Sequence, residues 1–204
     1  MKQILGVKDA MTQIFDENGF AVPVTVISVP ENTVTAVKTV ESDGYDAVQL
    51  AVGERNKKRV TKSVAGHIKK AGLDTVQSIR EFRTIADVSL GDKVTIDSFE
   101  EGDVVVISSV SKGKGFQGGV KRHNMSGGRR SHGNKHAERE IGSIGATGPQ
   151  RVFKGKKMPG RMGSDRITIK NLKIVKIDKD NNRLLIKGSI AGKRGDLVEI
   201  KAKA

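Results

Sequence analysis

A glycine pattern in the middle of the chain has the spacing of a dinucleotide-binding site. Gly113, Gly115 and Gly118 spell G-x-G-x-x-G and follow the apolar run VVVISSV. In dinucleotide-binding enzymes a helix begins directly after such glycines, and its N-terminus holds the pyrophosphate. The residues after Gly118, GVKRHNMSGGRRSHGNKH, carry no apolar stripe, so we expect no helix there. We therefore expect neither a nucleotide cofactor nor an oxidoreductase.

Two further patterns resemble an ATPase site and a metal site without completing either. The segment GKKMPGRM has the glycine spacing of a P-loop, but Arg161 and Met162 stand where Lys and Ser or Thr are required. His132 and His136 have the spacing of two zinc ligands, but the order H-E-x-x-H is absent and Lys135 would repel a cation. No Ser/His/Asp arrangement is discernible. We expect no metal and no enzyme activity.

The positive charge of the chain is concentrated in the same region. The 204 residues carry a formal net charge of +14. Between residues 111 and 163, 13 basic residues face two acidic ones, so this segment holds +11 of the total and 13 of the 24 glycines. Its apolar residues follow no regular period, and we expect no core within it. Such a charge restricts the partners to polyanions.

Interleaved glycines and basic residues are typical of a thin cationic strand that threads between RNA helices. Glycine permits close backbone approach, and Lys and Arg neutralise phosphate. Aromatic residues make up only 3% of the chain, which favours structured RNA over single strands read by stacking. No helix-turn-helix, basic zipper or zinc finger points to DNA. Phe153 and Met158 are isolated apolar side chains that either wedge against bases or pack on the folded part of the chain.

The predicted RNA contacts fall into three groups. Basic and histidine side chains of the segment are Lys112, Lys114, Lys121, Arg122, His123, Arg129, Arg130, His132, Lys135, His136, Arg139, Arg151, Lys154, Lys156, Lys157 and Arg161. The glycines expected to allow close backbone approach are Gly113, Gly115, Gly118 and Gly119. A second basic run is either another RNA contact or a solvated loop; it comprises Arg55, Lys57, Lys58, Arg59 and Lys62.

The flanks, residues 1–110 and 164–204, are nearly balanced in charge and predict a mainly β domain. Short β-branched runs indicate strands, namely AVPVTV, AVQLAV, LGDKVTI, EEGDVVVISSV, RITIKNLKIVKID, RLLIKGSI and LVEIKAKA. We predict a tight hairpin at Asn181-Asn182 and one helix from Ser63 to Ala71, capped by Ser63. Because strands lie on both sides of the basic segment, we expect a small closed barrel built from both ends of the chain.

Composition also bounds where the protein works. The chain has no cysteine, which suits a reducing compartment. No run approaches the roughly 20 apolar residues of a membrane span, and the N-terminus lacks the pattern of a signal peptide. We expect a soluble cytoplasmic protein with no membrane partner and no small-molecule substrate.

Three motifs together resemble one known family. FEEGDVVVISSVSKGKGFQGGVKRH (99–123), GSIG (142–145) and RVFKGKKMPGRMG (151–163) closely resemble the signature of the universal ribosomal protein L3 family in its bacterial form. ILGVKDAMTQIF and the final strands resemble it too, so the likeness covers essentially the whole chain. It implies a barrel of the translation-protein type and a structural, non-catalytic role in the large ribosomal subunit.

The resemblance also implies partners and a place for the basic segment. It implies direct binding to large-subunit ribosomal RNA early in assembly, beside neighbouring ribosomal proteins. One arm near Lys112 and a returning arm near Arg151 would carry the turn, about residues 127–148, toward the peptidyl transferase centre. The alternative is a free RNA-binding translation factor or RNA chaperone that associates with ribosomes reversibly.

Two positions depart from the family pattern. Some bacterial members carry an N-methylated glutamine before VFKGKK. Here Thr147 stands at that place, and the nearest glutamine is Gln150, which follows the proline. Gln150 is therefore the candidate for modification, but its different position argues against methylation. Pro159 stands where Ala is more usual, which should stiffen that turn.

Overall fold

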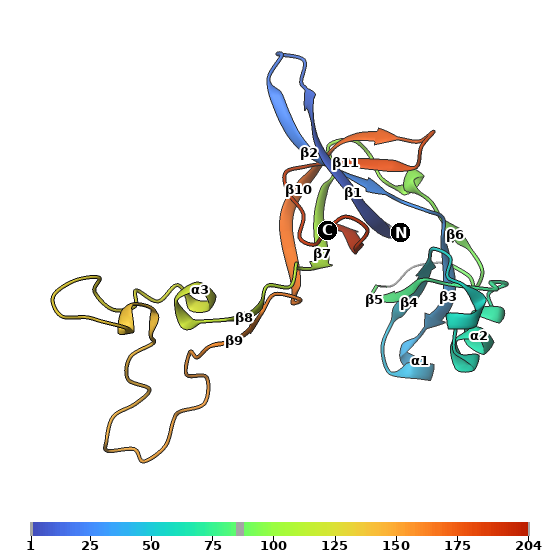
Figure 1. The fold of residues 1–204 in the computed structure, drawn as a ribbon. Helices are drawn as coiled ribbons and strands as arrows, with labels where there is room; N and C mark the ends of the chain where they lie inside the picture. The colour runs from blue at the N-terminus through green and yellow to red at the C-terminus, as the bar shows by residue number, and fades with distance from the viewer. Residues whose placement is uncertain (1, 85–87, 204) are drawn as a thin grey trace. The chain divides into compact units, whose positions relative to one another are not determined.

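The chain is mainly β and forms two compact units. The computed structural model describes residues 2–84 and 88–203. One unit comprises Met1–Val110 with Arg166–Ala204, and the other comprises Ser111–Asp165 (Figure 1). The predicted mainly β class is confirmed. Within the described residues, none of the helices is both long enough and apolar enough to cross a bilayer.

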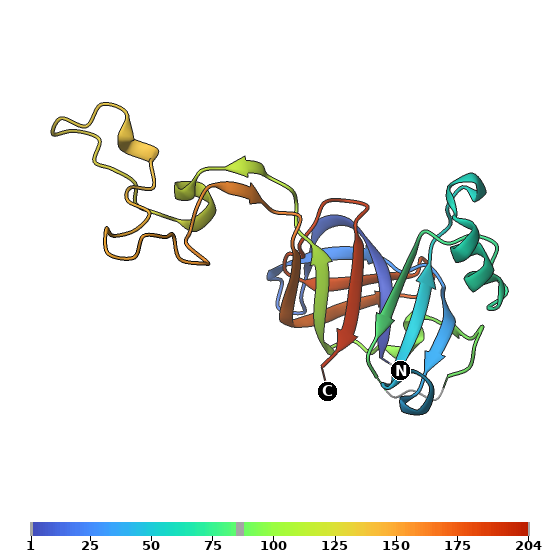
Figure 2. The ribbon, with the colours of Figure 1, turned by 90° about the horizontal axis from the view of Figure 1, so that it is seen from below.

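Six antiparallel strands of the first unit pair in a ring that closes as a barrel. In ring order they are β1 (Gln3–Phe15), β12 (Leu197–Ala202), β7 (Val104–Val110), β10 (Arg166–Asp178), β11 (Arg183–Lys187) and β2 (Ala21–Ser28) (Figure 2). Because β1 pairs with β12, strands from both ends of the chain lie side by side. The hairpin between β10 and β11 turns at the predicted place, where Asn182 has φ 50°.

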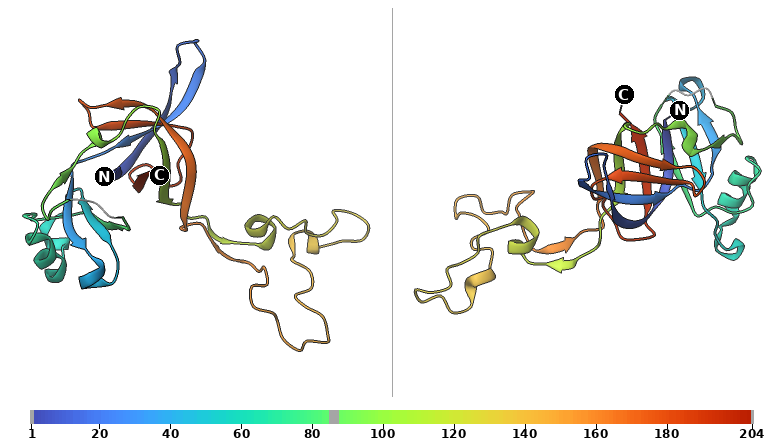
Figure 3. Two further views of the ribbon diagram at one scale, coloured as in Figure 1. Left: turned by 180° about the vertical axis from the view of Figure 1, so that it is seen from behind. Right: turned by 90° about the horizontal axis from the view of Figure 1, so that it is seen from above.

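A second, four-stranded sheet was not expected from the sequence. Its order is β5 (Ser78–Phe82), β4 (Ala47–Val52), β3 (Asn32–Lys38) and β6 (Lys93–Val94) (Figure 3). AVQLAV is a strand, as predicted, but it belongs to this sheet. It is buried along nearly its whole length, because Val48, Leu50 and Val52 belong to the large apolar core while Ala51 packs with Ile68 in a separate cluster.

The expectation of a single helix is wrong. The described residues contain α1 (Val40–Asp43), α2 (Lys62–Lys69) and α3 (Gly119–His123), with three-residue 3-10 turns η1 (Lys57–Arg59), η2 (Ile96–Ser98) and η3 (Ala137–Arg139). The predicted helix is α2, but Thr61 rather than Ser63 occupies its N-cap position. Ile68 of α2 packs with Ala51 and Val76 against the second sheet.

The barrel and the second sheet share one apolar core. Fully buried side chains such as Ile4, Ile107 and Ile186 from the barrel belong to the same cluster as Val34 and Leu50 from the sheet. Burial of each such side chain contributes about 1.5–3 kcal/mol. The continuous core therefore holds the two sheets together as one globular unit.

The side chain of Asn32 links the two sheets by hydrogen bonding to the backbone of Leu5, as a neighbouring strand would. Its side chain is fully buried; Oδ1 accepts a hydrogen bond from the Leu5 amide at 2.9 Å, and Nδ2 donates to the Leu5 carbonyl at 3.0 Å. Leu5 lies in β1 of the barrel and Asn32 begins β3 of the second sheet. The amide side chain thus satisfies two buried backbone groups where the sheets meet.

Glu199 fixes the first residue of β10. The side chain of Glu199 is 15% exposed. It forms one ion pair with Arg80, whose Nε lies 3.2 Å from Oε1, and a second with the guanidinium of Arg166. Arg166 pairs with Val110 at the end of β7, so the two strands that lead to the basic segment end side by side.

The second unit begins with a narrow stem. Strands β8 (Gly115–Gln117) and β9 (Gly160–Met162) pair antiparallel (Figure 1). The Lys114 amide donates to the Met162 carbonyl at 2.9 Å, and the Ser164 amide donates to the Ser111 carbonyl at 3.2 Å. Gly163 has φ 77°, and a Cβ there would collide with the Lys112 carbonyl oxygen. The stem is therefore built from backbone contacts that require glycine.

Replacing Asn32 by leucine should destabilise the globular unit. The substitution leaves the Leu5 amide and carbonyl buried without partners, at about 1–3 kcal/mol for each group. The urea midpoint of the full chain should fall accordingly. The exposed Asn18, changed to leucine, is the matched control and should shift stability by less than about 0.5 kcal/mol. Equal midpoints for the two variants would contradict the role of Asn32.

Replacing Gly163 by alanine should open the stem without unfolding the barrel. The left-handed conformation alone costs an alanine roughly 1–2 kcal/mol, so hydrogen exchange of the Lys114 and Ser164 amides should accelerate by about tenfold or more. Gly145→Ala is the control, since a Cβ there meets nothing within 4 Å. Unchanged protection in the Gly163 variant would show that the stem does not depend on this contact.

Candidate nucleic-acid interface

The glycine motif has a helix directly after it, contrary to the sequence-based expectation. Helix α3 begins after Gly118, spans five residues and ends at His123, and the left-handed backbone of Asn124 (φ 55°) caps it. A helix of little more than one turn leaves no periodic apolar stripe to detect. A dinucleotide site needs this helix between parallel strands. Here β8 lies within the motif itself and pairs antiparallel with β9, so the geometry of such a site is not formed.

Helix α3 is packed more tightly than the sequence indicates. Gly119 is buried, and a Cβ there would collide with Ile141 Cγ2 and lie 3.0 Å from Met125 Sδ. Ile141 and Met125 are half-buried. This local apolar contact adds to the segment, although the buried core clusters of the described residues contain no residue from 111–165. Of the four glycines predicted to allow close backbone approach, Gly113 and Gly119 lie near other atoms of the chain and Gly115 has φ 69°, whereas Gly118 lies in open space.

Two of the predicted RNA contacts, Arg122 and His123, hold the returning arm within the chain. Arg122 Nη1 donates to the Met158 carbonyl at 2.9 Å, and His123 Nε2 lies 3.0 Å from the same oxygen. The Arg122 guanidinium also covers Gly160, where a Cβ would lie 2.6 Å from Nη1. Both side chains are half-buried. Their polar atoms therefore fix α3 against the arm that follows Arg151.

The other fourteen predicted contacts in this segment are exposed. They are Lys112, Lys114, Lys121, Arg129, Arg130, His132, Lys135, His136, Arg139, Arg151, Lys154, Lys156, Lys157 and Arg161. Among these fourteen, only Arg130 forms an ion pair within the described chain, with Glu138 at 2.7 Å. Arg151 lies 5.7 Å from the centroid of the Phe153 ring. Gln150 is exposed too.

Exposed aromatic rings occur on both arms of the stem. Phe153 on the returning arm is 57% exposed, and Phe116 in β8 is 77% exposed. Phe116 is not among the RNA contacts predicted from the sequence. Phe116 lies in a glycine-rich stretch without alternating apolar and polar residues, so no sequence pattern indicates whether its side chain is buried or exposed. Each ring offers an apolar face to a base.

The histidine pair is not arranged as a metal site. His132 has φ 59°, and the 3-10 turn η3 starts only after His136, so the two rings do not share a helix face. No cluster of three or more His, Cys, Asp or Glu side chains suited to a metal ion occurs among residues 2–84 and 88–203.

The second basic run lies in the globular unit. Its five side chains, Arg55, Lys57, Lys58, Arg59 and Lys62, are all exposed. Lys57 pairs with Asp74 at 2.7 Å, which lowers the pKa of Asp74. The remaining four cations present no ion pair within the described residues.

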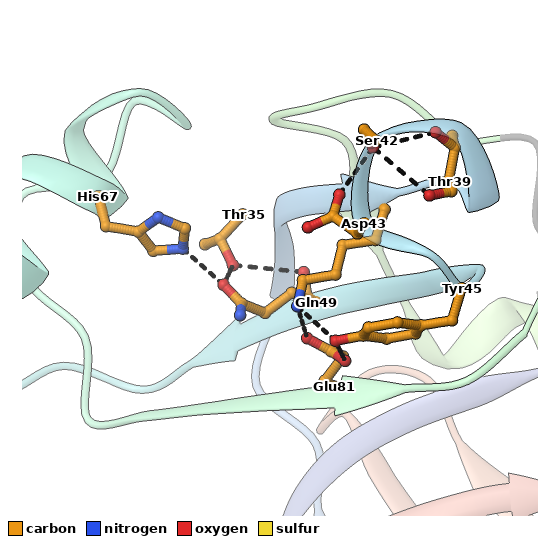
Figure 4. Close-up of polar contacts among 9 residues, drawn as sticks. Thr35, Thr39, Ser42, Asp43, Tyr45, Gln49, His67 and Glu81 are labelled. Atoms are coloured by element: carbon orange, nitrogen blue, oxygen red, sulfur yellow. Dashed lines mark hydrogen bonds and ion pairs between the residues drawn. The ribbon is translucent and has the colours of Figure 1, made fainter.

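A polar cluster on the second sheet is locked in its charged form (Figure 4). Lys38 Nζ contacts Tyr45 Oη at 2.5 Å and Glu81 Oε2 at 3.0 Å. The bonds to Tyr45 and Glu81 raise the pKa of Lys38. Burial opposes ionisation of Glu81, but the bonds from Lys38 and Tyr45 outweigh it and lower the pKa. Both shifts move the pKa values away from neutrality, so the pair is structural and unsuited to general acid–base catalysis.

Comparison with known proteins identifies the family. The sequence pattern described as Ribosomal protein L3 matches residues 56–184. A protein named large ribosomal subunit protein uL3 from Geobacillus stearothermophilus is 50% identical over 98% of this chain and 95% of its own length. Proteins of the same name from Alcanivorax borkumensis and Corynebacterium jeikeium are each 49% identical over 98% of this chain, and over 98% and 94% of their own lengths. The chain therefore belongs to the ribosomal protein L3 family.

Proposed function

We propose that this chain is a structural constituent of the large ribosomal subunit and binds large-subunit ribosomal RNA directly, early in assembly. Its relatives are named as proteins of the large ribosomal subunit, which supports the assignment of this chain to that subunit. The L3 family is a component of the cytoplasmic ribosome and not a family of enzymes, so we assign no catalytic residue. Neighbouring ribosomal proteins are its other partners.

The observation that carries this proposal is the set of fourteen exposed cationic or histidine side chains on residues 111–163. With one exception they are not neutralised within the described chain, in a segment with a net charge of +11. Unpaired cations on a thin backbone suit contact with RNA phosphates, and each contact releases counterions. In this role the barrel is of the translation-protein type, and the segment extends toward the peptidyl transferase centre.

Arg122 and His123 have a different part in the proposed interface. Their hydrogen bonds to the Met158 carbonyl hold the two arms at a defined separation, so the exposed cations of both arms face RNA in a fixed arrangement. The second basic run, with four unpaired cations, adds a contact from the globular unit.

Removing residues 112–162 should abolish most RNA binding while leaving a folded barrel. The cut joins Ser111 to Gly163; Gly163 and Ser164 then form a two-residue loop, and both already have the positive φ values that such a hairpin turn requires (77° and 57°). Affinity for large-subunit ribosomal RNA should be compared across a salt series, with circular dichroism as the check on folding. Retention of both affinity and salt slope in the folded deletion would assign binding to the barrel and the second basic run.

A paired lysine substitution separates specific contacts from total charge. Changing Lys154 and Lys156 to glutamine should reduce the salt slope by about 1.4–1.8, at roughly 0.7–0.9 per phosphate contact. The control changes the exposed Lys187 and Lys201 of the barrel to glutamine, which removes the same charge. Equal slopes for the two variants would contradict binding through the segment.

A further inference from the structure

The second unit contains a pocket with the polar and apolar character of a nucleobase site. Its volume is about 610 Å³, and its lining consists of residues 123–128, Ala137, residues 140–142 and Lys157. Met125 and Ile141 supply half-buried apolar walls. All of its lining residues belong to residues 111–165, so the pocket lies within one compact unit.

Opposite charges line this pocket without pairing. Glu140 and Lys157 are both exposed, and neither forms an ion pair within the described chain. Glu138, two residues before Glu140, does pair, with Arg130 at 2.7 Å. A carboxylate with two free oxygens and an ammonium group with three free donors therefore remain available on the wall of one pocket.

We propose that this pocket binds one unpaired guanine of an RNA strand, an inference that rests on the proposed function. The Watson–Crick edge of guanine presents N1–H and the N2 amino group side by side, with the O6 acceptor next to them. The Glu140 carboxylate accepts the two donors, and Lys157 donates to O6. The base stacks against Met125 and Ile141, as extruded bases do between apolar side chains.

The other bases satisfy this set of groups less well. Adenine and cytosine each offer a single amino group beside a ring acceptor, and uracil offers a single N–H between two carbonyls. When adenine, cytosine or uracil occupies the pocket, one carboxylate oxygen of Glu140 faces the base without a hydrogen-bond donor. An acceptor left without a donor and shielded from water by the base weakens binding. The pocket therefore selects guanine through its carboxylate, whereas the surrounding cations bind phosphate without regard to sequence.

The test uses the full chain and five-nucleotide RNA probes labelled for fluorescence anisotropy, with large-subunit ribosomal RNA as the reference. UUGUU should bind about tenfold or more tightly than UUAUU, UUCUU or UUUUU, because a bidentate base contact discriminates by that order. UUIUU, in which inosine lacks only the N2 amino group, should lose most of the preference. This probe tests the contact without any change to the protein.

Two isosteric variants complete the test. Glu140→Gln should lose the preference for UUGUU, whereas Glu138→Gln removes the same charge outside the pocket and should retain it. Equal binding of all probes by the wild type, with ribosomal RNA still bound, would overturn the guanine site and leave the proposed function standing. Loss of the preference in both variants would also overturn it. Failure to bind ribosomal RNA as well would contradict the proposed function itself.

Discussion

Like charges repel one another along both arms of the cationic segment, and the contacts that join the arms must overcome that repulsion. Residues 111–163 carry 13 basic side chains, and a large core cannot hold their two arms together. The arms are joined instead by backbone: β8 pairs with β9, and Gly163 packs against the Lys112 carbonyl. Arg122 adds a charged donor on a neutral carbonyl, which binds the arms without using an acidic partner. The exposed cations are thereby left for an external polyanion.

The strands that the sequence predicted are those with strong β-branched patterning. AVPVTV, VVVISSV, RITIKNLKIVKID and LVEIKA all lie in the barrel, and the turn predicted at Asn181-Asn182 connects β10 to β11. The second sheet escaped prediction because its join to the barrel is a tertiary contact: the Asn32 side chain bonds to Leu5, 27 residues away. No local pattern distinguishes a polar residue with that role from one in a loop.

The composition of the basic segment was readable from sequence, but the roles of its side chains were not. Charge and glycine content pointed to RNA, and the exposure of residues such as Lys154 is consistent with that. In the sequence, nothing distinguishes Arg122 from the other basic residues of the segment. Only its hydrogen bond to the Met158 carbonyl shows that it holds the returning arm. Glu140 and Glu138 also look alike, yet one is paired and the other lines a pocket. Such differences depend on which distant residues fold together.

Ultraviolet cross-linking of the full chain to large-subunit ribosomal RNA, followed by mass spectrometry of the cross-linked peptides, tests the RNA-threading role most directly. Cross-links should concentrate in peptides from residues 111–165, on both arms and around α3, with a smaller set from Arg55 to Lys62. Cross-links confined to the globular unit, with none from residues 111–165, would contradict the proposed interface.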